Sequence, residues 1–438
     1  MKMPRGIYEC VNCGHREVLD STEPVIERAC PKCGGDMILV GYAVSGVESP
    51  NVRSGREEVP APEGSGVSPG VEVPRESPHG LPPEVEAKLN EFYSLRFYGF
   101  DGHVAVFEVL DIYEKNFERV LRELENLGYW AALKKRDGRI VLFVFPAGKI
   151  PPDNPWLPWL FLVLTVLSTF FAGYYLALNY IATLEHYGLP GLRNPYIIAL
   201  SFSVSVMAII GTHELGHKIA ATYHGVKATM PYFIPFPNIL GTLGAVIRVK
   251  SPLPTRNAAI DLGVSGPIAG FLVAVPVTVL GLKLSVLVPM SMVPSTEGGL
   301  YFGTNLLFEA LQRLVLNVQG DYVIFLHPVA IAGWVGILVT FLNLIPVAQL
   351  DGGHILRAFI SEKAHKMITY AAALLLVGMS YLWSGWLIWA ILIIFIGSAG
   401  NPGALDEVSP ISKGRIVLAL TALVIFVITA TPRPLWTA

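Results

Sequence analysis

The sequence predicts a polytopic α-helical membrane protein with about seven transmembrane segments and a soluble N-terminal part. Of its 438 residues, 52% are hydrophobic and only 15% are charged, against about 25% charged residues in an ordinary soluble domain. The apolar residues gather in segments of roughly 20 residues, the length that spans a bilayer, and the first begins near Trp156. One soluble core of this size cannot bury so much apolar surface. This excludes a single soluble globular enzyme and a disordered scaffold.

The net charge and the N-terminal residues limit the possible partners and cellular location of the protein. The net charge is -2, which argues against a nucleic-acid-binding surface spread over the whole chain. No apolar stretch follows the opening MKMPRGIYEC, so we expect neither a cleavable secretory signal nor a transit peptide. We therefore expect a multi-pass protein of the cell membrane whose soluble N-terminal part stays in the cytosol.

All four cysteines lie within residues 1–44, in two Cys-x-x-Cys-Gly knuckles: Cys10 with Cys13, and Cys30 with Cys33. Four thiolates close a tetrahedral zinc site, and this pattern resembles a zinc ribbon with one structural zinc ion. Two disulfides are the alternative, which the expected cytosolic location disfavours. Zinc ribbons bind nucleic acid or protein, and the sequence does not choose between these partners.

Two further segments precede the membrane. Residues 45–83 are rich in Pro, Gly and Ser, a composition typical of a flexible linker. Residues 84–150 predict a small soluble α+β domain: a strand at 103–110, a helix with apolar residues at helical spacing from Tyr113 to Leu127, and two strands joined by a turn at Asp137-Gly138. Nothing in this domain indicates catalysis, so we expect a structural or partner-binding module.

Residues 151–438 form the predicted transmembrane domain. Its apolar segments lie at about 156–178, 194–223, 258–288, 323–349, 366–382, 384–400 and 415–432. Lys and Arg concentrate in the loops that are cytosolic if the N-terminus is inside, and this bias sets orientation. Those residues are Lys218, Lys227, Arg248, Lys250, Arg256, Arg357, Lys363, Lys366 and Lys413.

The second apolar segment contains His213-Glu214-Leu-Gly-His217. Two His four residues apart share one helix face and can hold one Zn²⁺, with Glu214 placed to take a proton from water. Ionisable residues are expensive inside a membrane, which favours a functional role. The alternative is a charged helix end that reaches the cytosol.

A catalytic zinc needs a third protein ligand. The fourth apolar segment ends in Asn343-Leu-Ile-Pro-Val-Ala-Gln-Leu-Asp351-Gly-Gly-His. With the N-terminus inside, Asp351 emerges on the same side of the membrane as His213 and His217. Pro346 is expected to break the helix, and Gly352-Gly353 to form a sharp turn. As a bare pattern, Asp-Gly-Gly after a helix is also a common turn.

Together these motifs resemble the site-2 protease family of intramembrane zinc metalloproteases, in its prokaryotic and plastid-type branch. The stretch Leu262-Gly-Val-Ser-Gly-Pro-Ile-Ala-Gly270 and the run that starts at Leu326 add to the resemblance. It implies a six-helix protease core in which His213, His217 and Asp351 bind the catalytic zinc. Glu214 would then be the general base, and Asn343 a catalytic residue of less defined role. The seventh segment lies beyond this core.

The resemblance implies transmembrane protein substrates within the lipid bilayer, cut near the cytosolic face in regulated intramembrane proteolysis. Between the second and third segments, the residues at 241–249 predict a strand or hairpin whose edge holds an unwound substrate by strand addition. Two alternatives remain: a transporter or sensor that uses the same residues for zinc, and a scaffold with a dead site. The sequence gives no oligomeric state.

Overall fold

The computed structural model describes the backbone of four N-terminal strands and residues 80–293, 300–317 and 321–437. The chain divides into two compact units, Met1–Val71 and Glu72–Ala438. In the first unit, four strands form an antiparallel sheet in the order β2-β1-β4-β3. Their bounds are β1 Arg5–Cys10, β2 Arg16–Leu19, β3 Val25–Ile26 and β4 Met37–Ala43. The side chains of the four cysteines, and with them the predicted zinc ribbon site, lie outside the described residues.

The second unit begins with an α+β domain. Its elements are α1 Pro83–Phe92, β5 Tyr93–Asp101, β6 Val104–Ile112, α2 Phe117–Asn126, β7 Tyr129–Arg136 and β8 Arg139–Pro146. The predicted helix and three strands are confirmed as α2, β6, β7 and β8, whereas α1 and β5 were not predicted. Asp137 and Gly138 both have positive φ, of 48° and 80°, as a two-residue hairpin turn requires. Both helices pack on one face of the sheet, where Leu89 and Leu124 are fully buried.

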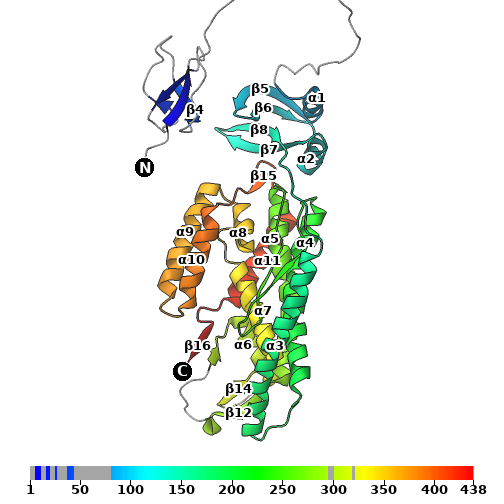
Figure 1. Cartoon of the computed structure of the whole chain (residues 1–438), viewed down its shortest axis with the longest axis vertical. Coiled ribbons are helices and arrows are strands. Elements are labelled where there is room, and N and C mark those ends of the chain that lie inside the picture. The colour runs from blue at the N-terminus through cyan, green and yellow to red at the C-terminus, as the bar shows by residue number, and fades with distance from the viewer. Residues whose placement is uncertain are drawn as a thin grey trace, which may run out of the picture. The chain divides into compact units, whose positions relative to one another are not determined.

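This sheet continues into the helical domain. Two short strands, β11 Leu253–Thr255 and β15 Ala404–Asp406, extend it to six strands in the order β11-β15-β7-β8-β6-β5 (Figure 1). β15 runs parallel to β7, and Asp406 pairs with Leu133. The α+β domain is therefore joined to the helices by backbone pairing as well as by the chain, a connection that no sequence pattern predicts.

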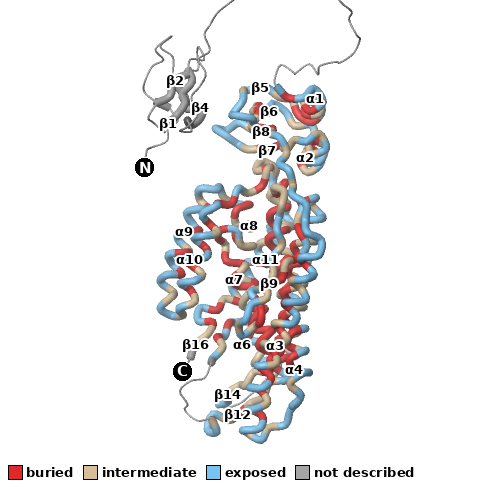
Figure 2. The backbone as a smooth tube through the Cα atoms, viewed as in Figure 1, coloured by how far each residue is buried: buried red, intermediate tan, exposed pale blue. Residues whose placement is uncertain are grey.

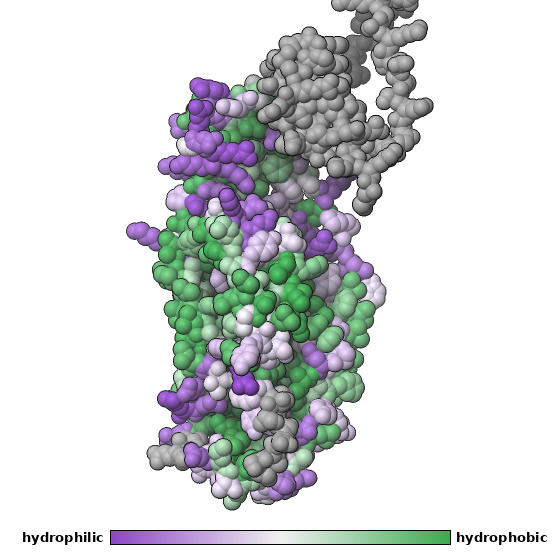
Figure 3. All heavy atoms as spheres, turned by 90° about the vertical axis from the view of Figure 1, so that its left-hand side faces the viewer, coloured by the Kyte–Doolittle hydropathy of each residue, from purple (hydrophilic) through white to green (hydrophobic). Residues whose placement is uncertain are grey.

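Three helices are long and apolar enough to cross a membrane: α3 Leu157–His186, α4 Pro195–Tyr223 and α5 Arg256–Leu284. The other four predicted segments contain shorter helices, so seven spans remain a prediction. These helices are α7 Pro328–Asn343, α9 Glu362–Met379, α10 Gly385–Ser398 and α11 Lys413–Thr429. On the face shown in Figure 3, apolar residues form a broad band with polar residues toward both ends.

The buried centre of the bundle lies between α4, α5 and α7, whereas the outer sides of α9 and α10 are exposed (Figure 2). Small residues let these helices approach one another closely, a feature also found between helices of membrane proteins. A Cβ at Gly336 would lie 2.9 Å from Ile209 Cγ2 of α4. α11 packs against the same group, since Phe426 stacks on Phe341 of α7 at 5.2 Å.

Several short elements were not predicted. They cap the end of the bundle farther from the α+β domain (Figure 1). They are β12 Val286–Pro289, a 3₁₀ turn Met290–Met292, β13 Leu300–Phe302, α6 Leu306–Leu316, β14 Tyr322–Phe325 and β16 Leu435–Thr437. β12 pairs with β14 and β13 with β16.

Candidate metal centre

The two histidines and the glutamate of the HExxH motif lie on α4. Asn194 caps this helix by accepting hydrogen bonds from the N–H groups of Tyr196 and Ile197, an arrangement favoured at helix starts. His213, Glu214 and His217 are all buried, with 5 to 6% of their surface exposed. Buried ionisable groups need partners, so the surroundings of these three side chains decide what they can do.

Asp351 supplies the third ligand atom. Its carboxylate lies 3.4 Å from His213 Nε2 and 3.3 Å from His217 Nε2, and the two Nε2 atoms are 3.1 Å apart. In a tetrahedral zinc site with bonds of about 2.0–2.1 Å, neighbouring ligand atoms are separated by about 3.3–3.4 Å. The three groups therefore fit one zinc ion and leave its fourth position open.

The orientation of His217 is fixed from α5. Its Nδ1–H donates to the carbonyl of Leu262 at 2.8 Å, which leaves Nε2 to face the metal position, as is usual for metal-binding His. A Cβ at Gly266 would overlap the His217 ring, and one at Gly270 would lie 3.1 Å from His213 Cβ. The stretch 262–270 carried only a family resemblance in the sequence, with no predicted role. The glycines of this stretch indicate its role, because they let α5 approach the two histidines.

The chain that leads to Asp351 is a broken helix, as predicted. α7 ends at Asn343, and α8 Asp351–Arg357 begins after a seven-residue irregular segment. The expectation that Gly352-Gly353 forms the turn is wrong, because both glycines lie inside α8. A Cβ at either would clash with carbonyl oxygens of the preceding segment. They are thus needed for close packing of α8 over the break.

The polar groups of the break are hydrogen-bonded to α9 and to the loop that follows α10. Ala348, at a positive φ of 52°, donates its N–H to Thr369 of α9 at 3.0 Å and accepts from Asn401 Nδ2 at 3.2 Å. Gln349 donates its side-chain amide to the carbonyl of Gly400 at 2.8 Å. Irregular backbone within a membrane needs such protein partners, and these contacts hold Asp351 in position.

Asn343 also reaches the site. Its Nδ2 lies 3.3 Å from His213 Nε2, so its amide is beside the ligand atoms. All five residues predicted for the catalytic site are thus brought together: His213, Glu214, His217, Asn343 and Asp351. Of the four predicted structural ligands, Cys10 ends β1, and its side chain and the other three cysteines lie outside the described residues.

A β-hairpin and two pockets border the site. β9 Tyr232–Pro235 and β10 Thr242–Val246 pair antiparallel. The strand predicted at 241–249 is confirmed as β10, whereas its partner β9 was not predicted. A pocket of about 210 Å³ contains the metal-binding side chains and Glu214, and it is bordered by Ala245 and Val246. A second, largely apolar pocket of about 330 Å³ adjoins it, and it too is lined by His213, Glu214 and β10. An unwound peptide beside β10 would therefore pass Glu214.

Known proteins with similar sequences support this description. Residues 201–384 match the model of peptidase family M50. The "Probable zinc metalloprotease EGY1, chloroplastic" of Arabidopsis thaliana is 31% identical over 55% of this chain and 44% of its own length. The "Probable zinc metalloprotease EGY2, chloroplastic" of the same plant is 25% identical over 70% of this chain and 57% of its own length. The chain thus spans about half the length of these curated relatives. No solved structure gives a significant match.

Proposed function

This chain belongs to peptidase family M50, the site-2 protease family, and we propose that it is an intramembrane zinc metalloendopeptidase. It hydrolyses peptide bonds in the transmembrane segments of other membrane proteins, near the cytosolic face. The observation that carries the proposal is the His213, His217 and Asp351 triangle. Its ligand atoms are spaced for one tetrahedral zinc ion inside an apolar helical bundle.

Each residue of the site has a proposed role. His213, His217 and Asp351 hold zinc, which when bound lowers the pKa of water and polarises a peptide carbonyl. Glu214 accepts the proton of the attacking water and returns it to the leaving amine. The Asn343 amide, beside His213 Nε2, donates a hydrogen bond to the oxygen of the scissile carbonyl.

The rest of the chain has proposed roles in localisation and recognition. We propose that it spans the lipid bilayer of a cell membrane about seven times, with its soluble domains in the cytosol. Its cleavage of transmembrane protein substrates serves regulated intramembrane proteolysis. Cys10, Cys13, Cys30 and Cys33 hold a structural zinc ion, and the ribbon that they form binds a protein or nucleic acid.

The test compares purified wild type with Glu214→Gln on a model transmembrane substrate in detergent with zinc. Glutamine keeps the size of the side chain but cannot accept the proton, so we expect cleavage by the wild type alone. Glu309→Gln is the matched control, because Glu309 is half-exposed on α6 and forms a local ion pair with Arg313. Zinc content should be equal in all three proteins.

Two results would contradict the proposal. Equal cleavage by wild type and Glu214→Gln would remove Glu214 from the chemistry. Zinc flux into vesicles by the wild type, without cleavage of any transmembrane substrate, would favour a transporter or sensor that uses the same ligands.

A further inference from the structure

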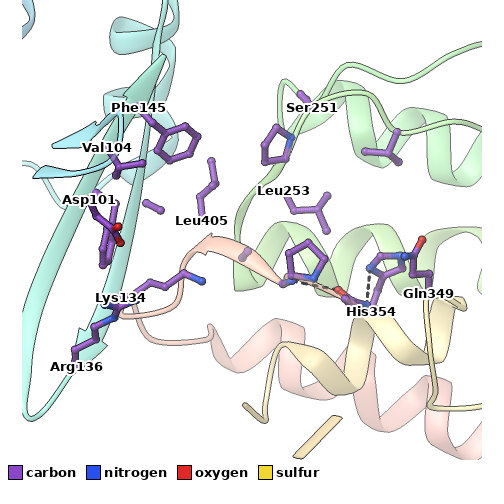
Figure 4. A pocket seen from close by; sticks show the side chains of 18 residues that line it. Asp101, Val104, Lys134, Arg136, Phe145, Ser251, Leu253, Gln349, His354 and Leu405 are labelled. Carbon is purple, nitrogen blue, oxygen red and sulfur yellow. Dashed lines mark hydrogen bonds between the residues drawn. The ribbon is translucent and has the colours of Figure 1, made fainter. Parts of the chain in front are cut away.

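A cavity of the second unit lies between the α+β domain and the helices, and it is larger than either pocket at the metal centre. It measures about 640 Å³, within the range of roughly 300–1,000 Å³ that ligand sites occupy. The α+β domain forms one wall and the loops at the inner ends of the helices form the other. In Figure 4, Phe145 and Lys134 project from the sheet into this space, with Leu253 and His354 on its other side. We call it the inner cleft.

The sheet wall of the inner cleft is the face that α1 and α2 leave uncovered. Side chains alternate along a strand, so Ala132, Lys134 and Arg136 of β7 line the inner cleft, while Ala131 and Leu133 point into the core under the helices. Phe143 and Phe145 of neighbouring β8 complete an aromatic and basic surface. A sheet face left open by its own helices is available to another polypeptide.

Basic residues outnumber acidic residues among the described residues that line the inner cleft. Arg136 lies over the Phe143 ring at 4.8 Å, and among the described residues neither Arg136 nor Lys134 has a carboxylate within ion-pair distance. Asp101 is the only acidic residue among the described residues that line the cavity. Two cations in a cavity that also contains aromatic rings favour an occupant that carries carboxylates as well as apolar groups.

The inner cleft is continuous with the metal centre. Val249, Gln349 and His354 line both the cleft and the pocket that contains Glu214 and Asp351. A polypeptide with its scissile bond at Glu214 would therefore pass these three residues and enter the cleft. This continuity points to one occupant, the substrate itself.

The two walls are held at a fixed spacing. β15 pairs with β7 on one side of the cleft. Lys250, next to the cleft loop, forms an ion pair with Asp153 at 2.7 Å. His224, beyond the end of α4, bridges Glu118 of α2 and Asp261 of α5 at 2.8 and 2.9 Å. The α+β domain is thus anchored at several points, as a preformed binding surface requires.

We propose that the inner cleft binds the extended flank of the substrate that leaves the membrane on the side of the α+β domain. It selects flanks that combine acidic and apolar side chains. Cytosolic flanks of transmembrane helices are usually rich in Lys and Arg, so a basic cleft rejects most of them, and specificity results from that repulsion as much as from attraction. This inference rests on the proposed function.

Direct binding tests the inference without cleavage. The probe is a fluorescent peptide with apolar residues and four Asp, compared with a peptide that has Asn at those positions. Both are titrated by anisotropy against the full chain with Glu214→Gln. We expect the Asp peptide to bind about tenfold more tightly, the gain of two partly exposed ion pairs. Lys134→Glu/Arg136→Glu should abolish this preference.

Lys135→Glu/Lys149→Glu is the matched control. It makes the same change in net charge at residues that do not line the inner cleft, so the preference for the Asp peptide should persist. Equal affinity for the two peptides, or an equal loss in both variants, would overturn the inference. Tighter binding of both peptides after deletion of residues 45–79 would also overturn it, because the chain's own linker would then be the occupant.

Cleavage separates this inference from the proposed function. Two substrates share one transmembrane segment and differ only in an acidic or neutral flank. We expect Lys134→Glu/Arg136→Glu to lower kcat/KM about tenfold for the acidic flank alone. An equal effect on both substrates would refute the cleft's selectivity. If the wild type cleaves neither substrate, the proposed function fails, and the binding measurement still decides the inference.

Discussion

Replacement of Gly266 by alanine should remove zinc from the proposed metal site without destabilising α5, the helix that contains Gly266. The new Cβ would lie 2.5 Å from both Cδ2 and Cε1 of His217, whereas carbon atoms in contact are about 3.5–4.0 Å apart. The imidazole must therefore move by about 1 Å. Metal–ligand distances hold to within about 0.2 Å, so His217 Nε2 would no longer reach the position shared with His213 and Asp351.

The expected loss of zinc affinity can be compared with the losses known for substitutions at other metal sites. Substitutions that only disturb the partners of a metal ligand lower affinity by about 10- to 100-fold. Displacement of a ligand should cost at least about 100-fold, or about 2.7 kcal/mol. Gly to Ala in a helix interior favours the helix by about 1 kcal/mol, so helix propensity would not explain the loss.

The assay is the zinc content of purified protein at increasing concentrations of a competing chelator, together with substrate cleavage. Gly211→Ala on α4 is the control, because its Cβ would meet only Phe233, at 3.9 Å. We expect Gly266→Ala to lose one zinc per chain at a chelator concentration that leaves Gly211→Ala unchanged. If Gly266→Ala retains zinc and cleaves substrate as well as the wild type does, the role given to the close contact between α5 and His217 is refuted.

Three further predictions concern the hairpin, the amide and the domain contact. Leu243→Pro on β10 should weaken substrate cleavage with bound zinc unchanged, whereas Leu243→Ala should not; equal cleavage by both would exclude strand addition there. Asn343→Ala should lower kcat about 100-fold while zinc is retained, and loss of zinc would show a structural role instead. Burial alone would lower the pKa of His224, but its hydrogen bonds to Asp261 and Glu118 outweigh this and raise the pKa to about 9. The ion pairs of His224 therefore stabilise the folded protein fully below pH 6.5, the usual pKa of histidine, and this stabilisation is lost as the pH rises through 9. It is worth about 2 kcal/mol after allowance for solvent screening. Amide hydrogen exchange in α2, corrected for its intrinsic rate, should accelerate between pH 6.5 and 9 in the wild type and not in His224→Gln. The same acceleration in both proteins would show that a group other than His224 causes it.

The grouping of the candidate site residues could be predicted because local rules fix it. His213 and His217 share a helix face at a spacing of four, and the order of the apolar segments brings Asp351 to the same side. The misassigned Gly352-Gly353 shows the limit. The reason for these glycines is contact with carbonyl oxygens of the preceding break, which no local pattern reveals. Sequence likewise cannot show that Leu262 accepts a hydrogen bond from His217, because any residue has a carbonyl.

The strands that were not predicted escaped prediction for other reasons. β11 and β15 are three residues each, too short for an alternating pattern. β5 contains Arg96 and Gly99 and has irregular register, which obscures its alternation. Asp261 of α5 accepts hydrogen bonds from His224 and from Arg415 of α11. Arg415 thereby gives the seventh segment a role that the sequence left open.

The shared sheet has a consequence for biosynthesis. The α+β domain is translated before the helices, but β15, its neighbour in the sheet, is made only after α10. β11 joins the sheet solely through β15, so it too must wait, although it directly precedes the helix that orients His217. Pairing between segments so distant in sequence is intrinsically slow. A ribosome-bound chain that already contains both histidines therefore still lacks β15, so its sheet is completed only after α10 has been made.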